Sequence, residues 1–209
     1  MSMTLYERHM ILSAVNNPDA LDHPDQDIHT TILATRVWLE KSVIGLNLCP
    51  FAKAVHIKKQ IRYVYSDAKS VKQLQRDLRV ELRLLADSAP TDIDTTLLIH
   101  PHVLQNFLDY NDFLDLADAA IEEADLDGEI QVASFHPQYQ FASTNIDDIE
   151  NFTNRSPYPT LHLLREASIE AAVAAFPDAA DIYEKNIVTM QSLGRQGWEN
   201  LFKSPPKKK

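Results

Sequence analysis

The sequence predicts an α/β fold: a small, mainly parallel sheet of at least three strands, flanked by helices, with an added C-terminal helical pair. Short runs rich in β-branched and aromatic residues alternate with amphipathic segments, and this alternation is typical of parallel strands joined by right-handed crossovers. The chain has 209 residues, of which 44% are hydrophobic and 24% charged. This size and composition are ordinary for one globular domain that buries its own core.

The N-terminal region divides into an extension and a first helix. Residues 1–27 end in a linker rich in Pro, Asp and Asn, which predicts an extension outside the domain. Apolar residues at helical spacing then predict a helix over 28–48, which ends in a turn that contains the sequence NLCPFA. We expect the single α/β domain to span residues 28–202.

Three runs, residues 61–66, 95–100 and 129–135, are predicted as strands from their composition and bounding turns. After the first, Ser70 and Gln73 form a capping-box pattern that opens a helix. After the second, apolar spacing predicts a helix over 105–124, either continuous or broken near Asn111.

Two further helices are predicted after the third strand, over residues 158–175 and 178–194. The segment GWENLF that follows is expected to pack back on the domain. Residues 203–209 form a lysine-rich end that we expect to be a disordered basic tail.

Charge and composition exclude several classes of protein. The formal net charge of −10 disfavours nucleic acid and anionic membranes as partners. No apolar run approaches the roughly 20 residues of a membrane helix, and the first residues lack a signal-peptide core, so a cytoplasmic location is expected. The single cysteine excludes an intramolecular disulfide and a multi-cysteine zinc site. No GxGxxG, P-loop, GxSxG or HExxH motif occurs. The sequence does not identify a cofactor or an oligomeric state.

Residues 135–166 form the stretch that is richest in candidate functional side chains. This long polar connection starts at the end of the third strand, and its aromatic residues argue against disorder. In open α/β sheets, ligands bind beyond the carboxyl ends of the strands. We therefore expect a site at the edge of the sheet where all three strands end.

The segment NRSPYP, residues 154–159, is interpreted as the start of the helix predicted over 158–175. Ser156 before Pro157 fits a helix N-cap, and the exposed N–H groups of a helix start attract anions. Arg155 adds a guanidinium suited to carboxylate or phosphate. The candidates for binding a small anionic molecule are Asn154, Arg155, Ser156, Tyr158, Arg165 and Glu166. One face of the predicted helix would carry Tyr158, His162, Arg165 and Glu166. The alternative interpretation is that Arg155 caps a loop and that Arg165 and Glu166 belong to a solvated surface network.

Four residues are candidates for catalysis. His136 follows a strand end, where it could act as acid or base with help from Tyr139 or His162, or could instead hold the loop in place. Cys49 could be a nucleophile if a histidine or arginine activated it. The C-terminal end of the preceding helix would raise its pKa, and a small buried thiol is the alternative interpretation.

Three functional hypotheses remain open from these residues. The first is an enzyme that acts on, or a protein that binds, a small phosphate- or carboxylate-bearing molecule. The second is a metal-binding protein, for which His100 and His102 are weak candidates with His136, His162 or Cys49 in support. The third is a non-catalytic module that binds another protein.

Four motifs resemble a known family: NLCPFA at 47–52, YSDA at 65–68, FHPQYQFA at 135–142 and NFTNRSPYPTLHLLREAS at 151–168. They are similar to a bacterial uncharacterised family, domain of unknown function 1415, over roughly residues 28–195. The resemblance implies a cytosolic bacterial protein with one domain. It implies no activity, since the family has none assigned.

Overall fold

The computed structural model describes residues 24–175 and 181–203 of the chain. Most of the predicted extension, residues 1–23, and most of the predicted basic tail, residues 204–209, lie outside the described residues. No described helix is long and apolar enough to cross a membrane.

The protein is built on a four-stranded mixed sheet, so the α/β class is confirmed and the predicted three-stranded, mainly parallel sheet is corrected. The strands lie in the order β1-β2-β4-β3. β1 pairs parallel with β2, whereas β4 pairs antiparallel with both β2 and β3. The three predicted strands are present and run in one direction, with bounds Ile61–Tyr65 for β1, Thr95–Ile99 for β2 and Ile130–Phe135 for β3.

The fourth strand, β4 (Thr160–Arg165), occupies the position where the sequence predicted the first half of a helix. Its two neighbours supply hydrogen bonds on both sides, and its side chains alternate between two covered faces. Because both faces are covered, the sequence TLHLLR shows no polar alternation, and its leucines also fit helical spacing. Only the second half of the predicted helix forms, as α6 (Glu166–Ala174).

One face of the sheet is covered by the helices α4 (Val71–Asp87) and α5 (Phe107–Glu123). Ser70 caps α4 by accepting a hydrogen bond from the N–H of Gln73, as predicted, and Asn106 caps α5 in the same way. α5 is continuous, so of the two alternatives for the helix predicted over 105–124 the unbroken one is confirmed. The main core lies here, between the leucines of α4, the aromatic and alanine residues of α5, and the side chains of β2 and β4 that face them.

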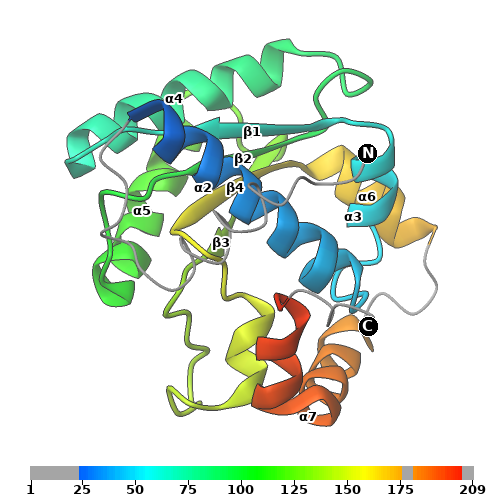
Figure 1. Ribbon diagram of the computed structural model, residues 1–209. Helices are drawn as coiled ribbons and strands as arrows, with labels where there is room; N and C mark the ends of the chain where they lie inside the picture. The colour runs from blue at the N-terminus through cyan, green and yellow to red at the C-terminus, as the bar shows by residue number, and fades with distance from the viewer. Residues whose placement is uncertain (1–23, 176–180, 204–209) are drawn as a thin grey trace.

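The opposite face is covered by α2 (Pro24–Trp38), a π-helical segment η1 (Leu39–Ile44) and the short α3 (Ala52–Ile57). The helix predicted over 28–48 is thus present as one continuous helical stretch over Pro24–Ile44, whose last part is π-helical, whereas α3 was not predicted. In Figure 1, α2 crosses in front of the sheet, and Trp38 packs with its ring 5.0 Å from that of Phe135. A second, smaller core forms around Trp38, Leu39 and Val43.

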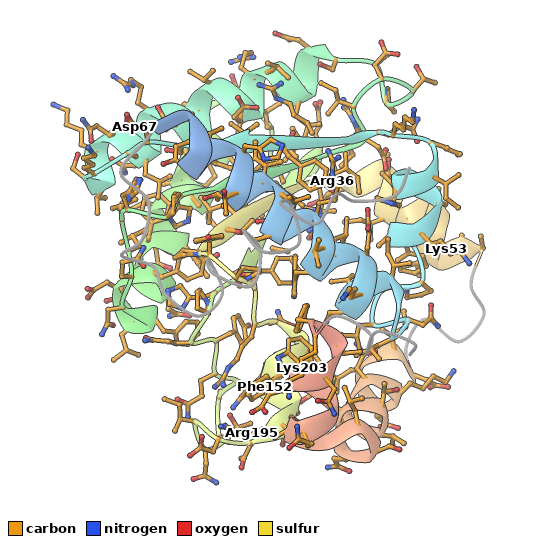
Figure 2. All side chains as sticks on the ribbon, viewed as in Figure 1. Arg36, Lys53, Asp67, Phe152, Arg195 and Lys203 are labelled. Atoms are coloured by element: carbon orange, nitrogen blue, oxygen red, sulfur yellow. The ribbon has the colours of Figure 1, made fainter. Side chains whose placement is uncertain are left out.

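The connection from β3 to β4 contains a 3-10 helix, η2 (Ile149–Thr153), that packs against α7 (Ile182–Leu201). Figure 1 shows the two segments side by side below the sheet, and Figure 2 places Phe152 and Arg195 at their junction. The rings of Phe152 and Trp198 lie 5.5 Å apart. The helix predicted to end at Gly194 is interrupted there by a kink, where a φ of 62° favours glycine, and α7 continues beyond the kink to Leu201.

Candidate functional site

A cavity of about 550 Å³ lies between the second face of the sheet and the elements η1, α3 and α6. It does not lie at the edge where the sequence placed the site, because it extends over the sheet to the amino ends of β1 and β2. Its walls are almost entirely apolar. The residues that line the floor and the nearest walls are Trp38, Leu39, Val43, Ile61, Thr95, Leu97, Ala133, Phe135, His162 and Leu164.

His162 lines this cavity from the centre of the sheet. In β4 it pairs with Leu97 of β2 on one side and with Ala133 of β3 on the other, and all three side chains point to the same face. The protein surrounds the ring, and this desolvation lowers the pKa of His162 to about 4. The imidazole is therefore neutral at physiological pH.

Thr95 determines which nitrogen of His162 carries the proton. Its Oγ1 lies 2.6 Å from the carbonyl oxygen of Leu163, to which it donates its only hydrogen. The same Oγ1 lies 2.7 Å from Nε2 of His162 and must accept from it. The ring is then protonated on Nε2, and Nδ1 keeps a lone pair that has no partner in the described part of the chain.

Cys49 lines the same cavity, in the turn between η1 and α3. From the sequence, only the end of the preceding helix was expected to act on the pKa of the thiol. In the structure Cys49 also precedes the short helix α3, and the backbone N–H groups of Phe51 and Ala52 point to its sulfur. These bonds favour the thiolate, but burial outweighs them and raises the pKa of the Cys49 thiol. At neutral pH, Cys49 and His162 are both uncharged.

Polar groups at the rim of the cavity are engaged with each other or with the fold. The hydroxyl of Ser168 in α6 donates to Asp94 at 2.6 Å. Arg165 donates to the carbonyl oxygens of Leu85, Ser88 and Ile93, where α4 ends and the chain turns toward β2. It therefore completes the end of a helix rather than extending from the surface.

The predicted anion site at NRSPYP is not built as expected, because no helix starts there. Ser156 is buried and donates to the carbonyl oxygen of Tyr158 at 2.6 Å, so it caps no helix. The guanidinium of Arg155 donates to the carbonyl oxygens of Tyr139 and Ile146 and stacks over the ring of Phe152. The alternative weighed from sequence, in which Arg155 holds the loop together, matches these contacts.

The remaining binding candidates lie in different places. Asn154 donates to the carbonyl oxygen of Ser134, and Glu166 is the first residue of α6. Tyr158 lines a smaller cavity of about 270 Å³ beside α2 and α7, together with Arg155 and Ser156. His162 and Arg165 lie on β4 and border the larger cavity, whereas Tyr158 precedes the strand and Glu166 follows it, so the predicted shared helical face does not exist.

His136 lies in a buried aromatic cluster at the carboxyl edge of the sheet and borders neither cavity. Its Nε2 donates to the carbonyl oxygen of Leu104 at 3.1 Å, and its Nδ1 accepts from the N–H of Gln138 at 3.0 Å. Its ring packs 5.0 Å from that of Tyr110. Tyr139 extends the same cluster through Phe107, at 5.1 Å. Both nitrogens of His136 thus hold the loop.

The two histidines of the HPH segment do not converge. His100 is buried, bonds through Nδ1 to the carbonyl oxygen of Val103 and stacks on Tyr110, and burial lowers its pKa to about 4. His102 is exposed, and its Nε2 lies 2.7 Å from the hydroxyl of Tyr65. Within residues 24–175 and 181–203, no group of three or more His, Cys, Asp or Glu side chains is arranged to hold a metal ion.

The predicted site residues therefore fall into three groups. The larger cavity is bordered by Cys49, His162 and Arg165, and the smaller cavity by Arg155, Ser156 and Tyr158. The aromatic cluster at the carboxyl edge of the sheet contains His136 and Tyr139. Sequence reasoning missed Thr95, Trp38, Leu97 and Phe135, which complete the first cavity. Each is an ordinary apolar or β-branched residue in a predicted strand or helix, so no local signal marked it.

Comparison with known proteins gives one match. A family described as a protein of unknown function (DUF1415) matches residues 30–200, which include the whole lining of the larger cavity. No curated protein matches the chain. No solved structure matches it. Since the match extends over most of the chain, this protein belongs to the DUF1415 family.

Proposed function

We propose that this protein binds a small, predominantly apolar molecule in the 550 Å³ cavity, and that His162 accepts a hydrogen bond from the ligand. The volume falls within the roughly 300–1,000 Å³ typical of small-molecule sites, which are mostly apolar with a few polar groups that fix orientation. The observation that carries the proposal is the free Nδ1 lone pair of His162 in an apolar cavity.

The charge state of the site defines the class of ligand. A neutral imidazole with a free lone pair favours a neutral donor, such as a hydroxyl, an amide or a ring N–H, and disfavours a carboxylate. The anionic ligand expected from the sequence loses support, because the helix start at Ser156 is absent and Arg155 is engaged. A ligand that donates to Nδ1 of His162 would add one hydrogen bond, with a net contribution of about 0.5–1.5 kcal/mol.

Indole and indene form a suitable pair of probes, since they share a bicyclic shape and only indole carries an N–H group. Titrations followed by ¹H–¹⁵N NMR should show that the wild type binds indole about 3- to 10-fold more tightly than indene, the range expected for one net hydrogen bond. In His162→Phe this preference should disappear. In Ala172→Trp, which places a large ring into the cavity from α6, both probes should lose affinity.

Failure to bind either probe, or a preference for indole that persists in His162→Phe, would contradict the proposal. Far-UV circular dichroism and a melting temperature for each variant separate loss of the site from loss of the fold.

A second candidate function follows from the presence of Cys49 in the same cavity as His162: an enzyme that uses the thiol as nucleophile and His162 as base. Burial raises the pKa of the thiol and lowers that of the imidazole, so the resting pair is neutral and poorly activated. The rate of alkylation by iodoacetamide against pH separates the two functions. An activated pair gives an inflection below the ordinary thiol pKa that disappears in His162→Phe, whereas a binding site gives neither effect.

A further inference from the structure

The outward face of α4 carries a row of cations, here called the basic stripe: Lys72, Arg76, Arg79 and Arg83. Spacings of four, three and four residues place them on one side of the helix, away from the buried Leu74, Leu78, Leu82 and Leu85. All four side chains are exposed, and they border a wide depression of about 920 Å³. The stripe is a local exception in a chain whose net charge is −10.

The neighbouring helix α5 carries the opposite charge, in a row here called the acidic stripe: Asp112, Asp115, Asp118 and Glu122. These side chains are exposed, and α5 contains no lysine or arginine. α4 and α5 pack against each other over the same face of the sheet, and Arg79 and Glu123 pair across them, so the two stripes lie on one surface. This surface is therefore divided into a positive half and a negative half.

Only some of the charged side chains on this surface form ion pairs within one chain. Arg79 pairs with Glu123 at 2.7 Å and joins the two helices. In the described part of the protein, Lys72, Arg83 and the four members of the acidic stripe make no ion pair. Large apolar side chains are exposed among them: Val80 is 58% exposed, Leu108 70% and Leu116 40%. Such residues together are typical of a surface that meets a partner.

We propose that the α4–α5 surface binds a second copy of this chain in a two-fold dimer, with the basic stripe of each copy against the acidic stripe of the other. A two-fold axis that runs along the helices places α4 of one copy opposite α5 of its partner, and the reverse contact follows by symmetry. A dimer that placed α4 against α4 would oppose like charges, so the charge pattern selects the first arrangement.

The dimensions of the surface suit a modest interface. Each helix has 17 residues and is therefore about 25 Å long, so two helices side by side cover roughly 500 Å² per copy. The total of about 1,000 Å² lies at the lower end for specific association and predicts a dimer that weakens as salt screens the charges.

Complementary charge reversals test this arrangement with the full-length chain. One variant carries Lys72→Glu and Arg83→Glu, and the other carries Asp112→Lys and Asp115→Lys. Arg76 and Arg79 are left in place because each pairs within the chain, with Asp77 and Glu123 respectively. Sedimentation velocity at low salt should show a wild-type dimer and two monomeric variants. Mixing the variants in equal amounts should restore a dimer, since each reversed stripe then meets a complementary one.

Three results would overturn the proposal: a wild type that is monomeric at all concentrations, reversals that leave a dimer intact, or variants that stay monomeric when mixed. Equal melting temperatures of the wild type and the variants at high salt would show that the reversals leave the fold unchanged. A monomer whose melting temperature falls on reversal of the basic stripe alone would assign the stripe to a contact within the chain, and so would also overturn the proposal.

Discussion

Oγ1 of Thr95 lies 2.7 Å from Nε2 of His162 and connects the first residue of β2 to the central strand β4. Because this hydroxyl already donates to the carbonyl oxygen of Leu163, it can only accept from the imidazole. One threonine thereby fixes both the tautomer of His162 and the acceptor character of the cavity. The proposed ligand preference depends on this bond.

Replacing Thr95 should show how much its hydrogen bond to His162 contributes to the free energy of unfolding, and the adjacent Thr96 provides a matched control. In Thr95→Val, Nε2 of His162 loses its partner in the interior, and we expect the free energy of unfolding to fall by about 1–3 kcal/mol. Thr96 is also fully buried, but its hydroxyl has no partner among the described residues. Thr96→Val should therefore be neutral or stabilising in urea denaturation. Equal losses in the two variants would contradict this account.

Stability should fall in mild acid because the fold desolvates two histidines, His100 and His162, and holds both in the neutral form. The pKa of His162 and that of His100 are lowered to about 4 in the folded protein, whereas the unfolded chain takes up these protons near pH 6.5. Each contribution is complete above pH 6.5 and is lost as the pH falls toward 4.

Urea denaturation of the wild type and of His162→Gln at pH 7 and pH 5 measures this effect. Between these values the wild type should lose about 2 kcal/mol more than His162→Gln. His29→Gln, which replaces an exposed histidine by the same residue, glutamine, is the control for the substitution itself. A wild type and a His162→Gln variant with the same pH dependence would show that His162 is not buried neutral.

Arg165 should be important for stability and not for recognition of an anion. Its guanidinium donates to the carbonyl oxygens of Ser88 at 2.6 Å and Ile93 at 3.1 Å, near the end of α4. Arg165→Met leaves these acceptors unpaired, and we expect a loss of about 3 kcal/mol. Arg165→Lys should recover only part of it, because an ammonium cannot reach all of these carbonyl oxygens at once. An unchanged melting temperature in Arg165→Met would refute the structural role.

The thiol of Cys49 should react slowly at neutral pH. Burial raises its pKa, so the thiolate, which is the reactive form, is scarce at pH 7. Alkylation by iodoacetamide should therefore be slower than for cysteine in a short peptide, and it should accelerate as the pH rises. Saturation with indole should slow the reaction further, since both occupy one cavity. Alkylation as fast as in the peptide would contradict the buried position of Cys49.

The sequence correctly predicts the helices and strands whose hydrophobic pattern fits only one type of secondary structure. The strands near 61, 95 and 130 are rich in β-branched residues between turns, and the helix after Ser70 has both a cap and a regular leucine spacing. The sequence does not predict β4, because both faces of this strand are covered and its leucines, Leu161, Leu163 and Leu164, fit a helix and a strand equally well. Only its pairing with β2 and β3, distant in the chain, decides between them.

The candidate site, like the fold, could be predicted only in part from the sequence. Motifs that carry unusual polar residues point to Cys49 and His162, which do line one cavity. They point equally to His136 and Arg155, whose polar atoms hold a loop in place. The sequence cannot separate these two groups, because the difference depends on which hydrogen bonds the folded backbone leaves available.

The most direct test is a long-range ¹H–¹⁵N NMR spectrum of the imidazole of His162 at pH 7, with and without indole. The account predicts a neutral ring with the proton on Nε2 and an unprotonated Nδ1 whose resonance shifts when indole donates to it. Thr95→Val should weaken this preference for one tautomer. A charged ring, a proton on Nδ1 or an Nδ1 resonance that does not respond to indole would contradict the proposed role of His162.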